Sequence, residues 1–104
     1  MAEEAQPPKE NRLQLTASVV ERDAVRHTPA GVPIVSARLF HRSMCKEADT
    51  ARLVEMEIPA IAVGSMADKL GQLPLEQTVR FSGFLTNRNR KSRQLVFHIS
   101  DFSL

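Results

Sequence analysis

Apolar and polar residues alternate with a period of two along residues 13–19 (LQLTASV). This period is typical of a strand with one buried face. The sequence TPAG at residues 28–31 predicts a turn, because proline presets the bend and glycine can adopt a positive φ. A second strand is predicted from about residue 34 to residue 42. The two strands are expected to form a hairpin with a rather long connecting loop.

Alternation resumes at residue 52, with apolar side chains at even positions up to residue 62 and Glu55 and Glu57 between them. Pro59 has no amide hydrogen to donate, so this third strand should lie at an edge, or be bulged, there. The sequence SMAD at residues 65–68 predicts a helix with Ser65 as its cap. Gly71 and Pro74 should end that helix after little more than one turn.

Two more strands are predicted over residues 78–86 and 94–102. Five strands with one short helix between the third and the fourth follow the order of the OB-fold, a Greek-key barrel. A small β-sandwich would show similar periodicity. Gly83 in the fourth strand fits the sharp bend that a closed barrel needs. The expected inward side chains are Val79, Phe81 and Leu85 on the fourth strand and Leu95, Phe97 and Ile99 on the fifth.

Length and composition indicate one all-β domain over residues 11–104, after a disordered tail at residues 1–10 that is rich in acids and proline. The longest apolar run, residues 58–63, is far too short to span a membrane. The acidic start is unlike a signal peptide. A single cysteine, Cys45, excludes an internal disulfide and fits a reducing compartment. We therefore expect a cytoplasmic protein with no membrane association.

No arrangement of residues indicates catalysis. His41 and Cys45 are four positions apart, roughly 13 Å in extended chain, which is too far for a direct hydrogen bond. The three histidines, His27, His41 and His98, do not have the spacing of metal ligands. Only four scattered glycines are present, and none forms a phosphate-binding loop. The sequence therefore predicts no enzyme activity, no metal and no cofactor.

The positive charge is concentrated in two blocks. The net charge is +3 over residues 11–42 and +4 over residues 78–104, whereas residues 43–77 sum to −3. The segment NRNRKSR at residues 87–93 lies between two predicted strands, at the position of a loop with which OB-folds grip oligonucleotides. A solubilising turn is the alternative. The predicted phosphate ligands of this loop are Arg88, Arg90, Lys91 and Arg93, and the first connecting loop carries Arg22, Arg26 and His27.

A second candidate surface lies on the predicted second strand. If its apolar residues face the core, Arg38, Phe40 and Arg42 line the outer face, where a base could stack between two phosphate contacts. Packing of Phe40 in a subunit interface is an equal alternative. Phe84 shares a face with Arg80 and has the same two interpretations, of which packing in a subunit interface is the stronger. The chain contains no Trp or Tyr, so any nucleic-acid binding should depend on phosphates and weaken strongly with salt.

The sequence resembles the family of primosomal replication protein N, called PriB, from about residue 11 to the end. The motifs that carry the resemblance include NRLxL at residues 11–15 and TPAGVP at residues 28–33. Others are HRS at residues 41–43, GF at residues 83–84 and LVFH at residues 95–98. Their order and spacing identify the family better than any one of them. Further matches are EA at residues 47–48, IP at residues 58–59 and VG at residues 63–64.

The resemblance implies an OB-fold homodimer that binds single-stranded DNA and acts with the replication-restart helicase and other primosomal proteins. It places Arg26, Arg42 and the four loop cations at DNA-contacting positions. The loop is about two residues shorter than in well-known members. Glu55 stands where those members have a DNA-stacking Trp, and an acid there should repel phosphate.

The sequence is therefore compatible with three functions. The first is electrostatic binding of single-stranded DNA. The second is a protein-interaction adaptor for the helicase with only weak DNA binding, which Glu55 favours. The third is an RNA-binding barrel, although clustered surface aromatics are missing. The acidic tail could also compete with DNA for the basic face, and deletion of residues 1–10 would test that idea.

Overall fold

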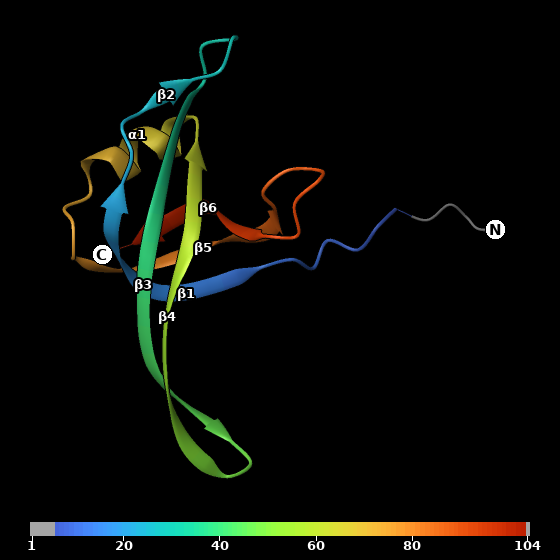
Figure 1. Ribbon diagram of the computed structural model, residues 1–104, viewed down its shortest axis with the longest axis vertical. Helices are drawn as coiled ribbons and strands as arrows, with labels where there is room; N and C mark the ends of the chain where they lie inside the picture. Colours follow the sequence, from blue (N-terminus) through green and yellow to red (C-terminus); the bar gives the residue numbers. More distant parts are fainter. Residues whose placement is uncertain (1–5, 104) are drawn as a thin grey trace.

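The computed structural model describes residues 6–103, in which the strands close into a barrel (Figure 1). Residues 6–12 form neither helix nor strand, and the predicted tail at residues 1–10 lies partly outside the described residues. The elements are β1 (Leu13–Arg22), β2 (Arg26–His27), β3 (Pro33–Glu47), β4 (Thr50–Val63), α1 (Ser65–Gln72), β5 (Thr78–Asn87) and β6 (Leu95–Ser103).

The strands are hydrogen-bonded in the order β1-β5-β6-β4-β3, and β3 pairs back with β1 to close the barrel. All these pairs are antiparallel except β4 with β6, which runs parallel at Ala60 and Ile61. On the side of β4 that faces β6, the ladder begins only after Pro59. The proline therefore lies at an edge on that side, as predicted. The two-residue β2 adds to the start of β3. The OB-fold with one helix before its fourth main strand is confirmed.

The barrel is filled by the alternating side chains that the sequence predicts. Phe81 and Phe97 are completely buried, and α1 adds Ala67 and Leu70 to the same core (0% exposed each). Burial of such a large side chain contributes about 1.5–3 kcal/mol. Arg22 lies in β1 rather than in the first connecting loop, which corrects the prediction. Its guanidinium donates to the carbonyl oxygens of Leu70 (2.9 Å) and Leu73 (2.6 Å), so it fastens the helix end to the barrel.

Helix α1 differs from the prediction at both ends. Gly64, with φ of 74°, occupies the cap position, Ser65 is already helical, and no side chain caps the helix. The helix also continues through Gly71 to Gln72, for eight residues. A glycine inside a helix costs only about 1 kcal/mol, which the burial of Leu70 offsets. Within the described residues, no helix is long and apolar enough to cross a membrane.

Leu95 was predicted to face inward, but it is 51% exposed, whereas Val96 is buried. Leu95 pairs with Asn87 at the last step of the β5–β6 ladder, beyond the part of the barrel that other strands cover. Val96 instead lies against the base of the β5–β6 loop, beside Arg88 and Gln94. The alternation therefore gives the wrong face where the barrel ends.

β3 and β4 are longer than predicted, because their pairing continues to Glu47 opposite Thr50. Ala48 and Asp49 both have positive φ (51° and 64°) and form a tight two-residue turn of the kind that closes hairpins. The hairpin extends past the barrel as an arm, residues 43–54 (Figure 1). Most side chains of the arm are exposed, so it lacks the alternation that marks a half-buried strand, and the predicted strand limits at residues 42 and 52 were wrong.

Candidate nucleic-acid interface

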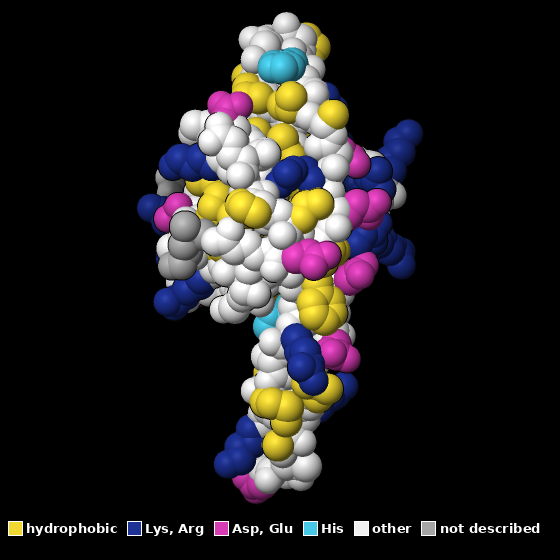
Figure 2. All heavy atoms as spheres, turned by 90° about the vertical axis from the view of Figure 1, so that its left-hand side faces the viewer, with side chains coloured by type: hydrophobic (Ala, Val, Ile, Leu, Met, Phe, Trp, Pro, Cys, Tyr) yellow, Lys and Arg dark blue, Asp and Glu magenta, His cyan; other side chains and the backbone are white. Residues whose placement is uncertain are grey.

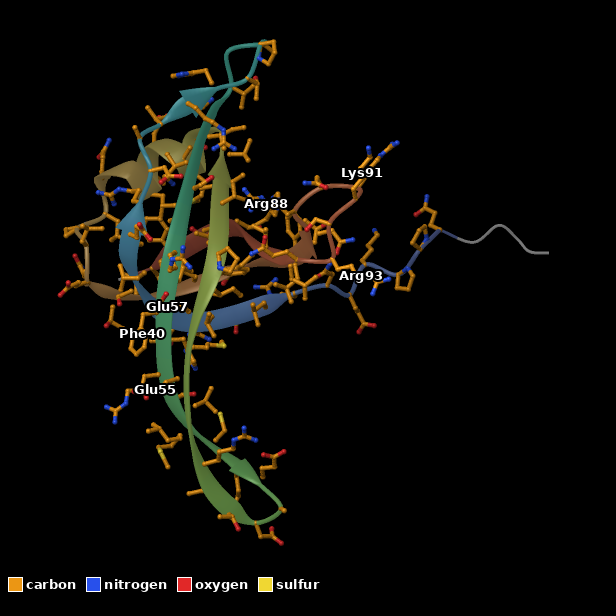
Figure 3. The ribbon with its side chains drawn as sticks, viewed as in Figure 1. Phe40, Glu55, Glu57, Arg88, Lys91 and Arg93 are labelled. Atoms are coloured by element: carbon orange, nitrogen blue, oxygen red, sulfur yellow. The ribbon has the colours of Figure 1, made fainter. Side chains whose placement is uncertain are left out.

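The basic loop, residues 88–94, joins β5 to β6 and stands away from the barrel (Figure 3). The backbone N–H of Arg88 donates to the carbonyl of Gln94 (2.9 Å) and closes the loop. The Asn89 side-chain oxygen accepts from the N–H of Lys91 (2.9 Å), and the Ser92 hydroxyl accepts from the N–H of Gln94 (3.0 Å). Backbone and neutral side chains thus shape the loop and leave its cations available.

The cations of the basic loop are exposed. Arg88 donates to the side-chain oxygen of Gln94 (3.3 Å), which is a neutral acceptor. Arg90, Lys91 and Arg93 have no ion-pair partner among residues 6–103. Like charges this close repel one another, and the phosphates of a nucleic acid relieve that repulsion. The loop therefore has the electrostatic character of a phosphate-binding site.

The second predicted surface, the outer face of β3 and β4, is different. Arg38, Phe40 and Arg42 lie on the outer face as predicted, but both arginines are paired with carboxylates. Arg42 Nε lies 3.0 Å from Glu55 Oε2. Arg38 Nε lies 3.2 Å from Glu21 Oε1 and 3.7 Å from an oxygen of Glu57.

These ion pairs change the charge of the face more than its stability. Exposed pairs contribute only about 0–1 kcal/mol to folding. Two arginines against three glutamates nevertheless leave the face slightly negative. Phe40, half-buried, lies between Glu55 and Glu57 on one side of the ribbon, well separated from the basic loop (Figure 3). Figure 2 shows acidic and basic side chains intermixed along the β3–β4 ribbon rather than a continuous basic field.

A hollow of about 240 Å³ connects the two surfaces. Arg38 and Arg88 both line it, together with the acidic side chains of Glu21 and Asp23. Ser36 lies in the same wall and accepts a hydrogen bond from Arg26 (3.1 Å). The fold thus brings Arg38 and Arg88 around one depression, and Arg26 is bonded to Ser36 in its wall. It leaves Arg42 and Phe40 lower on the ribbon and Arg90, Lys91 and Arg93 on the loop.

His41 and Cys45 are linked only through Ser43. His41 Nδ1 lies 2.7 Å from the Thr16 carbonyl oxygen, to which it can only donate, and Nε2 lies 2.7 Å from the Ser43 hydroxyl oxygen. Ser43 lies 3.5 Å from the Cys45 sulfur. Cys45 lies on β3, and its contact is the Ser43 hydroxyl rather than the His41 ring. Within residues 6–103 no group of three or more His, Cys, Asp or Glu side chains could hold a metal ion.

The sequence interpretation singled out Glu55 but missed Glu21 and Glu57 as partners of Arg38. Glu57 stands directly opposite Phe40 in the β3–β4 register. The two-residue turn fixes that register, so recognition of the turn would have placed Glu57 beside Arg38 as well. Glu21 is brought near Arg38 by the β1–β3 pairing, which contains a bulge after Val19. No local sequence signal reports that contact.

Comparisons with known proteins agree with this geometry. Residues 11–101 match a family model that is described as "Another single-strand binding protein family". The replication restart protein PriB of Bordetella pertussis is 39% identical over 89 residues, which cover 86% of this chain and 83% of that protein. The solved structure of PriB from Ralstonia solanacearum has a TM-score of 0.81 and 46% identity, over 89% of this chain and 95% of that chain. A small single-stranded DNA-binding protein from Streptomyces coelicolor (TM-score 0.69, 17% identity, 93% and 94% coverage) shares the fold alone.

Proposed function

This chain belongs to the PriB family of replication restart proteins, and from that premise we propose that it binds single-stranded DNA mainly through its basic loop. One observation carries the proposal. Arg90, Lys91 and Arg93 have no carboxylate partner among the described residues, whereas Arg38 and Arg42 are neutralised on the β3–β4 face. A phosphate binds most favourably to a protein cation that is not already paired with a carboxylate.

Binding of this kind has little sequence preference, because phosphate contacts carry no base information. Three of the four loop cations are arginines, whose planar guanidinium groups can form two hydrogen bonds to one phosphate. Arg26 and Arg88 extend the contact along the hollow beside the loop. Phe40 could stack on a base only if the strand passes between Glu55 and Glu57, which repel its phosphates.

In the cell, we infer a non-catalytic accessory role in bacterial replication restart. The chain would act as a cytoplasmic homodimer that bridges the restart helicase to helicase-loading partners while it holds single-stranded DNA. Family membership and the absence of a catalytic arrangement in the sequence support this role. The slightly negative β3–β4 face, with its exposed ion pairs and Phe40, leaves a surface for protein contacts beside the DNA-binding loop.

Titration of a labelled oligo-dT of about 30 nucleotides at several salt concentrations tests the proposal. We expect the logarithm of the binding constant to fall with the logarithm of salt with a slope of about −2 to −4, because each phosphate contact on a single strand contributes about −0.7. Failure to bind even at low salt would contradict DNA binding. Competition by unlabelled RNA at equal or lower concentration would indicate an RNA-binding barrel instead.

The ion pair between Arg42 and Glu55 favours a second candidate function, an adaptor for the restart helicase with only weak DNA binding. The substitution Glu55→Gln tests whether DNA uses the β3–β4 face, which an adaptor would keep for its protein partner. If DNA crosses the β3–β4 face, the freed Arg42 should raise affinity about 5-fold at about 0.1 M salt and steepen the salt slope by about 0.7. Fluorescence polarisation with oligo-dT measures both quantities.

Glu47→Gln is the matched control, because it frees Arg52 in the same way (2.6 Å pair) at the tip of the arm. Affinity should not change in that variant. If Glu55→Gln behaves like Glu47→Gln, DNA does not cross the β3–β4 face, and that face is available for a protein partner. Glu55→Trp would then also leave affinity unaltered.

A further inference from the structure

Phe84 lies on the outer face of β5 and is 40% exposed. Its ring stacks on His98 of β6, with ring centroids 5.0 Å apart and planes 20° from parallel. Burial lowers the pKa of His98 and so favours its uncharged form. The two rings form a rigid aromatic platform on strands other than those of the β3–β4 ribbon.

The platform borders a hollow of about 390 Å³ with basic side chains on its rim. Lys9 and Arg12 line this hollow together with Phe84. The hollow depends on the segment before β1, which Asn11 fastens to β5. The Asn11 side-chain amide donates to the carbonyl of Leu85 (2.7 Å) and accepts from the N–H of Leu85 (3.0 Å). This paired contact holds two cations beside an exposed aromatic ring.

We propose that this hollow is a second nucleic-acid subsite, in which a base of single-stranded DNA stacks on Phe84 and the adjoining phosphates lie against Lys9 and Arg12. The proposal rests on the proposed DNA binding by the basic loop. Phe84 lies on β5, four residues before Arg88, which is the first residue of the basic loop, and four residues of extended chain span roughly 13 Å. The segment before β1 and the basic loop also project from the same side of the barrel (Figure 1), so one strand of DNA can reach both.

The chemistry of the rim favours a nucleic acid. An exposed aromatic ring beside cations is the combination with which single-strand binders hold bases and backbone, and each stacked base contributes about 1–3 kcal/mol. The hydroxyl groups of Ser82 and Ser100 can hydrogen-bond to the polar edge of a base. Asp101, the acid on the rim, accepts a hydrogen bond from the N–H of Phe102 (2.9 Å), which satisfies part of its carboxylate.

The substitution Phe84→Trp gives a direct test, because the full chain contains no Trp or Tyr and the indole would be its only such fluorophore. We expect its emission to be quenched as oligo-dT of about 30 nucleotides binds, in step with the polarisation signal of the labelled DNA. Leu75→Trp is the control. Leu75 is 51% exposed and lies beyond the other end of the β1–β5 ladder, so its emission should not change.

A second variant separates stacking from charge. Phe84→Leu should lower affinity by about 5- to 150-fold, the equivalent of one lost stacking contact, and leave the salt slope unchanged. Phe84→Tyr should restore affinity.

If DNA binds normally while the indole emission and the affinity of Phe84→Leu stay unchanged, the subsite is overturned and loop binding stands. If the unaltered protein does not bind DNA, both proposals fail. An emission shift that depends on protein concentration without DNA would show that a second copy of the chain covers this face, and would overturn the subsite.

Discussion

Replacement of Arg88, Arg90, Lys91 and Arg93 together by alanine is expected to lower the affinity for single-stranded DNA by up to about 600-fold at about 0.1 M salt. Each phosphate contact contributes about 0.7 to the salt slope, so four contacts contribute about 2.8 powers of ten between 1 M and 0.1 M salt. Arg38 and Arg42 do not compensate, because they already face carboxylates.

The conformation of the basic loop should not change in this variant. Its closing hydrogen bonds come from backbone groups, Asn89 and Ser92, and only Arg88 uses its charged side chain, on a neutral acceptor. Fluorescence polarisation between about 50 and 500 mM salt should show the slope falling by about 2.8. An alanine variant that keeps the full slope would show that DNA is held elsewhere.

Lysine at the three arginine positions of the loop is the matched control. The substitutions Arg88→Lys, Arg90→Lys and Arg93→Lys keep the charge but remove the planar guanidinium groups. The salt slope should stay as in the unaltered protein, and affinity should fall only modestly through the lost two-point hydrogen bonds. The comparison separates loss of charge from loss of geometry.

The barrel could be predicted from the sequence because its strands carry one buried face each. Period-two alternation reports such a face directly, and the fully buried Phe81 and Phe97 follow from it. The arm could not be predicted in this way, because most of its side chains are exposed. Its turn at Ala48 and Asp49 also lacks the glycine that usually marks a positive φ.

The sequence predicted the charged residues of the candidate site, but not the ion pairs and ring contacts that they form. The position of the basic loop follows from local sequence, since four cations between two strands must lie in a connection. The ion pairs depend on register, which a one-residue shift would change completely. Arg42 meets Glu55 only because the turn has two residues, and Phe84 meets His98 only because of the bulge between Ser82 and Gly83. Such contacts are properties of the closed barrel.

That bulge makes Gly83→Ala the substitution with the largest expected effect on stability. A Cβ atom at Gly83 would lie 1.9 Å from the carbonyl oxygen of His98 and 2.8 Å from the ring of Phe97. The first of these is a backbone atom of the neighbouring strand and cannot rotate away. Relief requires β5 and β6 to separate where the barrel is completely filled, so we expect a loss of about 3–5 kcal/mol in the free energy of unfolding.

Thermal unfolding followed by circular dichroism should therefore show Gly83→Ala melting at least about 12 °C below the unaltered protein, at about 4–8 °C per kcal/mol. Gly71→Ala is the matched control. Apart from its chain neighbours and the backbone of its own helix, no atom lies within 4 Å of the added methyl group, and alanine favours a helix over glycine by about 0.5–1 kcal/mol, so this variant should melt slightly higher. A Gly83→Ala midpoint within about 2 °C of the unaltered protein would show that the strands yield easily. In that case the β5–β6 hairpin would not be the rigid support that the basic loop and the Phe84–His98 platform require.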